Sequence, residues 1–163
     1  MLQNLIRRDP PSYREEFIRQ HGHYESQRAI FMEQPTAANT EAFSELIGFM
    51  SQVASSFPDL TPTFADDLAQ LLLKQHNSLN PDLREKLVQS LVLLKNKDVI
   101  TSSQLLQTMF PVLTSTASKQ LRGQIYRSVV TDMRNSNNKV KNHTPRFQSS
   151  LVSLVGQRPL VEV

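Results

Sequence analysis

The side chains best suited to acid–base or metal chemistry are few in this chain and widely separated. The histidines are His21, His23, His76 and His143. Only the first two are close in sequence, and on a helix a spacing of two points their rings about 200° apart, so we do not expect them to share a metal ion. Asp66 and Asp67 are adjacent carboxylates in the first turn of a predicted helix, where the helix dipole and solvation explain them fully.

The other residue types needed for catalysis or cofactor binding are also scattered. The chain has four glycines, all isolated, so it lacks a phosphate-binding loop and a dinucleotide fingerprint. No serine or threonine has a histidine at a spacing suggestive of a catalytic triad. We therefore predict a protein that is not an enzyme and that has no metal site, no cofactor and no small-molecule substrate.

The C-terminal part of the chain is strongly basic, although the net charge is only +3. Residues 1–118 contain 10 basic and 13 acidic residues, whereas residues 119–163 contain 8 basic and 2 acidic ones. This asymmetry indicates an acidic partner, with RNA one candidate, bound through phosphate contacts without sequence recognition. The candidate residues are Lys119, Arg122, Arg127, Arg134, Lys139, Lys141 and Arg146. A solvated helix surface followed by a tail would explain the same charges. Tyr126, the aromatic residue among them, is expected to pack against a neighbouring helix.

The composition predicts a soluble, intracellular protein. There are no cysteines, which excludes a disulfide framework and thiolate metal sites. The N-terminus lacks the apolar run of a signal peptide, and no window approaches the roughly 20 apolar residues that span a bilayer. A chain of 163 residues can form one domain. No membrane partner is expected.

The stretch 80–97 is the clearest helix signal. Asn80 is a favourable N-cap residue and Pro81 suits the first helical position. Asp82 and Glu85 lie near the positive end of the helix dipole, and Lys95 and Lys97 lie near its negative end. The apolar stripe is Leu83, Leu87, Val88, Leu91, Val92 and Leu94. Because this stripe covers more than one side, the helix should contact both a preceding and a following helix.

Other helices are predicted before and after it. A short apolar patch covers Leu2, Leu5 and Ile6. Further helices are expected at about 13–33, 40–57, 62–77, 101–113 and 117–135, with a short one around 147–155. Their predicted starts are Ser12 with Glu15, Thr61, Thr101 with Gln104, and either Ser115 or Thr116. Pro111 should kink or split its helix, and the polar residues 135–138 should end the 117–135 helix.

Helices of about 15 to 20 residues joined by short, proline-marked turns predict an all-α fold. The pairs would repeat about every 40 residues, which is typical of an α-solenoid of antiparallel helix pairs, HEAT-like or armadillo-like. A closed helical bundle is the alternative.

Three blocks of sequence resemble one protein family in the same order and at similar spacing. The first runs from Leu2 to Pro10, with Ser12-Tyr13 and Glu16-Phe17. The second is Asn80-Pro81-Asp82-Leu83-Arg84, followed by Leu93 to Lys97 and Ile100. The third runs from Val129 to Asn135 and from Asn138 to Asn142. Together they are similar to the N-terminal part of the SDA (severe depolymerization of actin) family.

This resemblance implies a function that the residues alone do not. Family members are helical-repeat, non-enzymatic factors of the nucleus and nucleolus. They take part in large (60S) ribosomal subunit biogenesis and nuclear export, and are linked to protein transport and actin cytoskeleton organisation. The implied partners are pre-60S proteins and, as one candidate, pre-ribosomal RNA. The alternative is a helical-repeat protein–protein adaptor in nuclear or protein transport without direct ribosomal contact.

The resemblance also suggests a domain boundary. Residues 1–142 form the expected helical-repeat domain, and 143–163 form a divergent C-terminal tail. We expect truncation or alternative splicing to explain this tail, because family members are several times longer.

Overall fold

The computed structural model describes residues 1–139, and the side chains of residues 1–135. Within that range the chain is all-α and contains no strand. The helices are α1 (Leu2–Arg8), α2 (Arg14–Glu33), α3 (Ala37–Val53), α4 (Phe64–Gln75), α5 (Pro81–Asn96), α6 (Ser102–Ser115) and α7 (Lys119–Lys139). Short 3₁₀ segments, Pro10–Tyr13 and Ala54–Ser56, precede α2 and follow α3.

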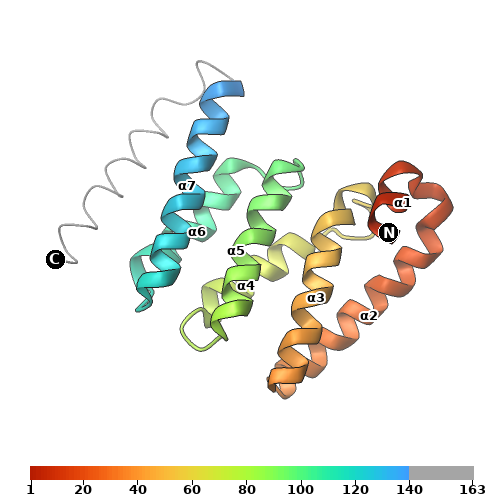
Figure 1. Cartoon of the computed structure of the whole chain (residues 1–163), viewed down its shortest axis with the longest axis horizontal. Coiled ribbons are helices and arrows are strands. Elements are labelled where there is room, and N and C mark those ends of the chain that lie inside the picture. The colour runs from red at the N-terminus through yellow and green to blue at the C-terminus, as the bar shows by residue number, and fades with distance from the viewer. Residues whose placement is uncertain (140–163) are drawn as a thin grey trace.

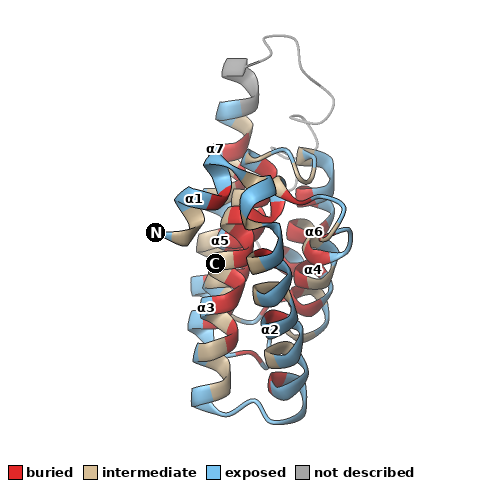
Figure 2. Ribbon diagram, turned by 90° about the vertical axis from the view of Figure 1, so that its right-hand side faces the viewer, coloured by how far each residue is buried: buried red, intermediate tan, exposed pale blue. Residues whose placement is uncertain are grey.

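The helices form antiparallel pairs stacked side by side, which is the predicted α-solenoid. The pairs are α2 with α3, α4 with α5, and α6 with α7 (Figure 1). Helices α3, α5 and α7 form one layer, and α2, α4 and α6 form the other (Figure 2). Successive pairs touch mainly through the α3–α5 and α5–α7 contacts, so the structure extends in one direction and does not close into a bundle.

The core lies between the two layers and follows the predicted periodicity. The buried face of α3 has helical spacing and also takes in two residues beyond the end of the helix: Phe43, Leu46, Ile47, Met50, Val53, Ala54 and Phe57. In α5 the predicted leucines are buried, and the helix contacts α3, α4, α6 and α7. Aromatic rings join α2 to its neighbours: Phe17 stacks on Phe57 at 4.4 Å, and Phe31 on Phe43 at 5.0 Å. Each such pair contributes about 0.5–1.5 kcal/mol beyond simple burial.

Two of the predicted helix starts are confirmed. The Asn80 side chain accepts a hydrogen bond from the Asp82 N–H at 2.8 Å. Thr101 and Gln104 form the reciprocal capping box, with bonds of 3.1 and 2.8 Å between side chains and backbone. Each of these caps satisfies a donor that the first helical turn would otherwise leave unpaired.

Two other predicted starts are wrong, because their side chains bond elsewhere. Ser12 donates to the Asp9 carboxylate at 2.6 Å, and α2 begins only at Arg14, after a 3₁₀ turn. Thr61 is buried and donates to the Phe57 carbonyl at 2.9 Å, so it ties the α3–α4 connection together and does not cap α4. Helix α4 begins at Phe64.

Some helix bounds also differ from expectation. Thr36 caps α3, which therefore starts before residue 40. Of the two outcomes predicted for Pro111, a kink or a split, the split does not occur: α6 continues to Ser115, and Gln107, whose carbonyl loses its helical donor, is exposed to solvent and can be hydrated. Helix α7 continues through the polar residues 135–138 to Lys139, because Asn and Ser weaken a helix without breaking it. The predicted helix around 147–155 and the predicted 143–163 tail lie outside the described residues.

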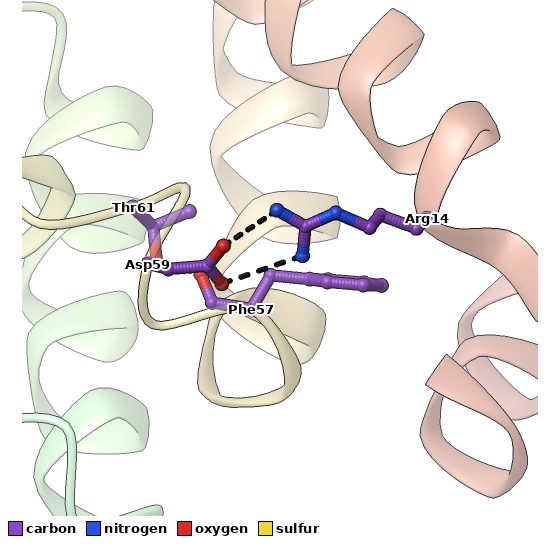
Figure 3. Close-up of polar contacts among 4 residues, drawn as sticks. All are labelled: Arg14, Phe57, Asp59 and Thr61. Carbon is purple, nitrogen blue, oxygen red and sulfur yellow. Dashed lines mark hydrogen bonds and ion pairs between the residues drawn. The ribbon is translucent and has the colours of Figure 1, made fainter. Parts of the chain in front are cut away.

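An ion pair fixes the start of α2 to the α3–α4 connection. Figure 3 shows the Arg14 guanidinium against both carboxylate oxygens of Asp59, at 2.5 and 3.5 Å. The hydrogen bond from Arg14 holds the pKa of Asp59 below its ordinary value, and the same bond raises the pKa of Arg14. Both side chains are largely exposed, so solvent screens their attraction.

Candidate acidic-partner surface

The turn between α6 and α7 sets where the basic helix begins. The Ser118 hydroxyl accepts a hydrogen bond from the Leu121 N–H at 3.2 Å, which caps α7. The Thr116 hydroxyl in turn accepts from the Ser118 N–H at 3.2 Å. Both predicted caps are therefore wrong: Ser115 lies in the last turn of α6, where it donates to the Pro111 carbonyl, and Thr116 ends that helix.

Three of the predicted basic residues share the exposed side of α7. The buried side of the helix carries Leu121, Ile125, Val129 and Asp132. Lys119, Arg127 and Arg134 are exposed, and at 100° per residue they fall within a wedge of about 80° opposite the buried stripe. We call these three residues the basic face.

Of the remaining candidates, Arg122 does not join this face. Arg122 is half-buried, and its guanidinium donates to the Thr116 carbonyl at 2.9 Å, so it supports the α6–α7 turn. Lys139 is the last residue of α7, and its side chain is not among those described. Lys141 and Arg146 lie outside the described residues.

The acidic side chain that α7 has among the described residues does not lie at the surface. Asp132 is buried and forms an ion pair with the ammonium group of Lys95 from α5, which is also buried. The basic face therefore has no neutralising carboxylate on its own helix. The sequence contained a signal for this pair: Asp132 continues the 121–125–129 apolar period, and Lys95 comes after Leu91 and Leu94 on the buried side of α5. Our assignment of Lys95 to the helix dipole alone missed it.

A small hollow of about 50 Å³ lies beside the basic face, between α7 and the start of α5. Arg127 lines it from α7, and Arg84 and the acidic Glu85 line it from α5. The Arg84 guanidinium donates to the His76 carbonyl at 3.2 Å and to the Ser118 hydroxyl at 3.4 Å. Arg84 is therefore a cation that the sequence did not place near the basic face, because only the packing of α5 against α7 brings it there.

Tyr126 differs from its prediction. It is 45% exposed on α7, so it is not buried against a neighbouring helix. It lies on the helix one position before Arg127, so an aromatic surface is available beside the basic face.

Several of the residues considered for catalysis make contacts within the helical fold. His21 lies 3.6 Å from the Glu25 carboxylate one turn away, and His76 is buried with its Nδ1 at 3.1 Å from the Leu72 carbonyl. Asp67 lies 3.9 Å from Arg28, at the start of α4. The described residues contain no group of three or more His, Cys, Asp or Glu side chains placed to hold a metal ion. None of the helices in residues 1–139 is long and apolar enough to cross a membrane.

Comparison with known proteins gives a consistent family match. Residues 49–158 match the sequence model of the SDA1 HEAT-repeat family. The chain is 49% identical to "Protein SDA1" of Chaetomium thermophilum, over 87% of this chain and 19% of that protein. It is 42% identical to "Protein sda1" of Schizosaccharomyces pombe, over 94% and 22% of the two chains. It is 45% identical to the SDA1 homologue of Xenopus tropicalis, over 87% and 20%. The chain thus spans about a fifth of the length of these relatives.

Proposed function

This chain belongs to the SDA1 family, and from that premise we propose that it is a non-enzymatic scaffold in large (60S) ribosomal subunit assembly and nuclear export. Its place of action would be the nucleolus and nucleus. The resemblance on which the sequence prediction rested supports this proposal, as does the extended helical-repeat fold. Stacked helix pairs present long surfaces, which suits a protein that bridges several components of a particle.

The observation that carries the proposal is the basic face. Lys119, Arg127 and Arg134 point into solvent from one helix whose described carboxylate is buried against Lys95. Such a face attracts a polyanion by releasing its counterions, and it needs no base-specific contact. Pre-ribosomal RNA is the polyanion that a pre-60S particle would offer.

Sedimentation tests the assembly role directly. We expect the tagged full chain, expressed in cells, to co-migrate with pre-60S particles when nuclear extract is resolved on a gradient. We also expect its migration to shift to lighter fractions when the extract is treated with ribonuclease. Migration with neither the precursor nor the mature large subunit would contradict the proposal.

The basic face is tested by charge reversal. Arg127→Glu with Arg134→Glu should weaken binding of the purified chain to a single-stranded RNA. Since each phosphate contact contributes about 0.7 to the slope of log affinity against log salt, the slope should become shallower by about 1.4. A fluorescence anisotropy titration over a range of salt concentrations measures this slope.

A matched control changes the net charge by the same amount at another place on the protein. Arg8 and Lys74 are exposed on α1 and α4, away from α7. Arg8→Glu with Lys74→Glu should leave the salt slope close to that of the wild-type chain. Equal losses in the two double variants would show that net charge, and not the basic face, governs RNA binding.

A protein–protein adaptor without ribosomal contact is the second candidate function, and a groove between α3 and α5 favours it. An adaptor predicts no charge-dependent affinity for RNA and no effect of reversing Arg127 and Arg134. The same salt titrations of the two double variants therefore separate the candidates.

A further inference from the structure

The hollow between the start of α5 and α7 has walls from two helices that lie side by side (Figure 1). The α5 residues have the spacing i, i+3, i+4, and three of the α7 residues have the spacing i, i+4, i+7, so each set follows one side of its helix. The lining residues are Pro81, Arg84 and Glu85 on α5, and Gln120, Leu121, Gln124 and Arg127 on α7. Because Arg127 also belongs to the basic face, the hollow continues that face toward α5.

The volume of the hollow suits one small ionic group. About 10–15 Å³ of such space holds a water molecule, so 50 Å³ holds roughly three to five water-sized groups. A phosphate group, which is a phosphorus atom surrounded by oxygens, is of that size. A nucleobase or an aromatic side chain is larger.

Arg84 brings to the hollow a positive charge that its own contacts do not neutralise. The guanidinium donates to two neutral acceptors, the His76 carbonyl and the Ser118 hydroxyl, and these bonds fix its position. Its Nε is buried and has no hydrogen-bond partner among the described residues. A guanidinium that is already held in place can bind an anion without the entropy cost of ordering a free side chain.

Arg127 reaches the hollow because Gly123 lies one turn before it on α7. A Cβ at position 123 would stand 3.2 Å from Nη1 of Arg127, which is closer than ordinary van der Waals contact. The guanidinium therefore lies over the bare backbone of Gly123, toward the start of α7 and the hollow. Glycine weakens a helix, and here the space that it leaves is the place that Arg127 occupies.

One carboxylate also lines the hollow, but it has a partner elsewhere. Glu85 accepts a hydrogen bond at 3.2 Å from Gln89, one turn further along α5 and outside the hollow. Its backbone carbonyl accepts from the Gln124 amide at 3.0 Å, which joins α5 to α7. Asp82, the acidic residue in the first turn of α5, does not line the hollow. With two guanidiniums and one carboxylate, the lining has a net charge of +1, so it favours an anion.

We propose that this hollow holds one backbone phosphate of RNA, between the guanidiniums of Arg84 and Arg127 and beside the side-chain amide of Gln120. RNA is favoured over other phosphate-bearing molecules because Lys119 and Arg134 continue the positive charge along α7 beyond the hollow. A phosphodiester chain offers further phosphates to those two side chains, whereas a phosphorylated protein side chain offers only its own. This inference rests on the proposed RNA binding of the basic face, and it adds the site at which one phosphate is held.

A carboxylate placed in the hollow tests the inference. Gln120→Glu changes the charge of the lining but hardly its shape, and a carboxylate in the first turn of α7 suits the helix dipole, so the helix is retained. We expect the affinity for a fluorescent oligo(U) RNA, measured by anisotropy, to fall by about fivefold or more. Gln70→Glu changes an exposed glutamine of α4 and is the matched control, which should bind as the wild-type chain does.

Removing both guanidiniums tests whether they hold the same phosphate. Arg84→Gln with Arg127→Gln should make the slope of log affinity against log salt shallower by about 0.7, the contribution of one phosphate. A change of about 1.4 would overturn the inference, because each guanidinium would then hold a phosphate of its own. The anisotropy titrations over a range of salt concentrations measure this difference.

Two further results would also overturn the inference. One is an RNA affinity of Gln120→Glu equal to that of the wild-type chain. The other is displacement of the RNA by an equal concentration of a peptide with one phosphoserine and otherwise neutral side chains, because the hollow would then select a phosphorylated protein. Circular dichroism checks that each variant is as helical as the wild-type chain, and Gln120→Glu carries the test if Arg84→Gln unfolds.

The failure of this inference is distinguishable from the failure of the proposed function. If Arg127→Glu with Arg134→Glu weakens RNA binding and Gln120→Glu does not, the basic face is retained and the hollow is not a phosphate site. Failure of the assembly role appears as absence of the chain from pre-60S fractions of the gradient, which is a separate measurement from binding of purified RNA.

Discussion

Tyr24 lies buried between α2, α3 and α4, with its ring stacked on Phe43 and edge-on to Phe64. Its hydroxyl is fully buried and has no hydrogen-bond partner among the described residues. A buried hydroxyl without a partner costs about 1–3 kcal/mol, because it loses its bonds to water. The aromatic packing must offset this cost, which makes Tyr24 a site where the sequence is not optimal for stability.

Replacing this residue should therefore stabilise the protein. Tyr24→Phe keeps the ring contacts and removes the hydroxyl, so the free energy of unfolding should rise by about 1 kcal/mol at neutral pH. Urea denaturation measures the change. Tyr126→Phe on the exposed side of α7 serves as the control and should have no effect. A loss of stability in Tyr24→Phe would show that the hydroxyl has a partner, such as a buried water.

Tyr24 also makes the free energy of unfolding depend on pH in the alkaline range. Burial raises the pKa of Tyr24 above its ordinary value of 10.0. The unfolded chain then loses this proton at lower pH than the folded chain does, so stability is complete below pH 10 and falls as the pH rises further. In Tyr24→Phe this part of the alkaline loss should disappear. Urea titrations on either side of pH 10 measure it.

At the scale of single residues, the helical period explains which basic side chains of α7 face solvent. Lys119, Arg127 and Arg134 are exposed because 100° per residue places them opposite the buried stripe of that helix. Arg122 was predicted on the outer side with them, but the same 100° per residue places it beside the buried stripe, where its guanidinium bonds a carbonyl of the preceding turn. The exposure of Tyr126 was also missed.

At the scale of helices, the buried Lys95–Asp132 pair links α5 to α7. Removing one partner leaves a buried charge without compensation, which typically costs about 3–5 kcal/mol. We expect Lys95→Met and Asp132→Leu each to lower the free energy of unfolding by roughly that amount. The double variant should recover most of the loss, because it buries no charge.

A double-mutant cycle in urea measures this coupling. The single variants and the double variant are compared with a chain carrying Lys97→Met, a lysine near the same helix end that is only partly buried. Additive effects, with the double variant less stable than either single variant, would show that the two side chains do not interact.

Helix starts were predictable where a side chain caps its own helix. Asn80 and Thr101 do so, because each side-chain oxygen accepts a hydrogen bond from a backbone N–H in the first turn of its helix. Ser12 and Thr61 have equally suitable side chains, but Asp9 and the Phe57 carbonyl accept their hydroxyl protons. Such competition depends on the local path of the chain, which the spacing of residue types does not specify.

At the scale of the whole molecule, stability should vary along the solenoid. Helix α5 contacts α3, α4, α6 and α7, whereas α1 packs mainly on α3 and the adjoining 3₁₀ turn. We expect backbone amides of α5 to exchange with solvent deuterium roughly tenfold more slowly, or slower still, than those of α1. Mass spectrometry of peptides from the exchanged chain measures this difference. Equal protection in α1 and α5 would indicate a single cooperative unit.

The solenoid itself was predictable, because helices of similar length joined by short turns have few ways to pack. Two features were harder to predict from the sequence. One is that the helices form an open solenoid and not a closed bundle, and the other is the groove between α3 and α5. The groove needs α3 and α5 side by side, so that Gly48 and Gln89 line one hollow although 41 positions separate them. Neither residue is distinctive in its own helix. The sequence therefore indicates the repeat unit more readily than the surface that two units make together.

The stacking of pairs in one direction turns position in the sequence into position along the molecule. Helices α2 and α3 carry three basic and six acidic residues, α4 and α5 carry four of each, and α6 and α7 carry five and one. From the α2–α3 pair to the α6–α7 pair the charge therefore rises, although α1 before them carries Arg7 and Arg8, and these pairs form an electric dipole along the stack. A polyanion would rotate these helix pairs during approach so that α7 arrives first, with α2 and α3 turned away from it.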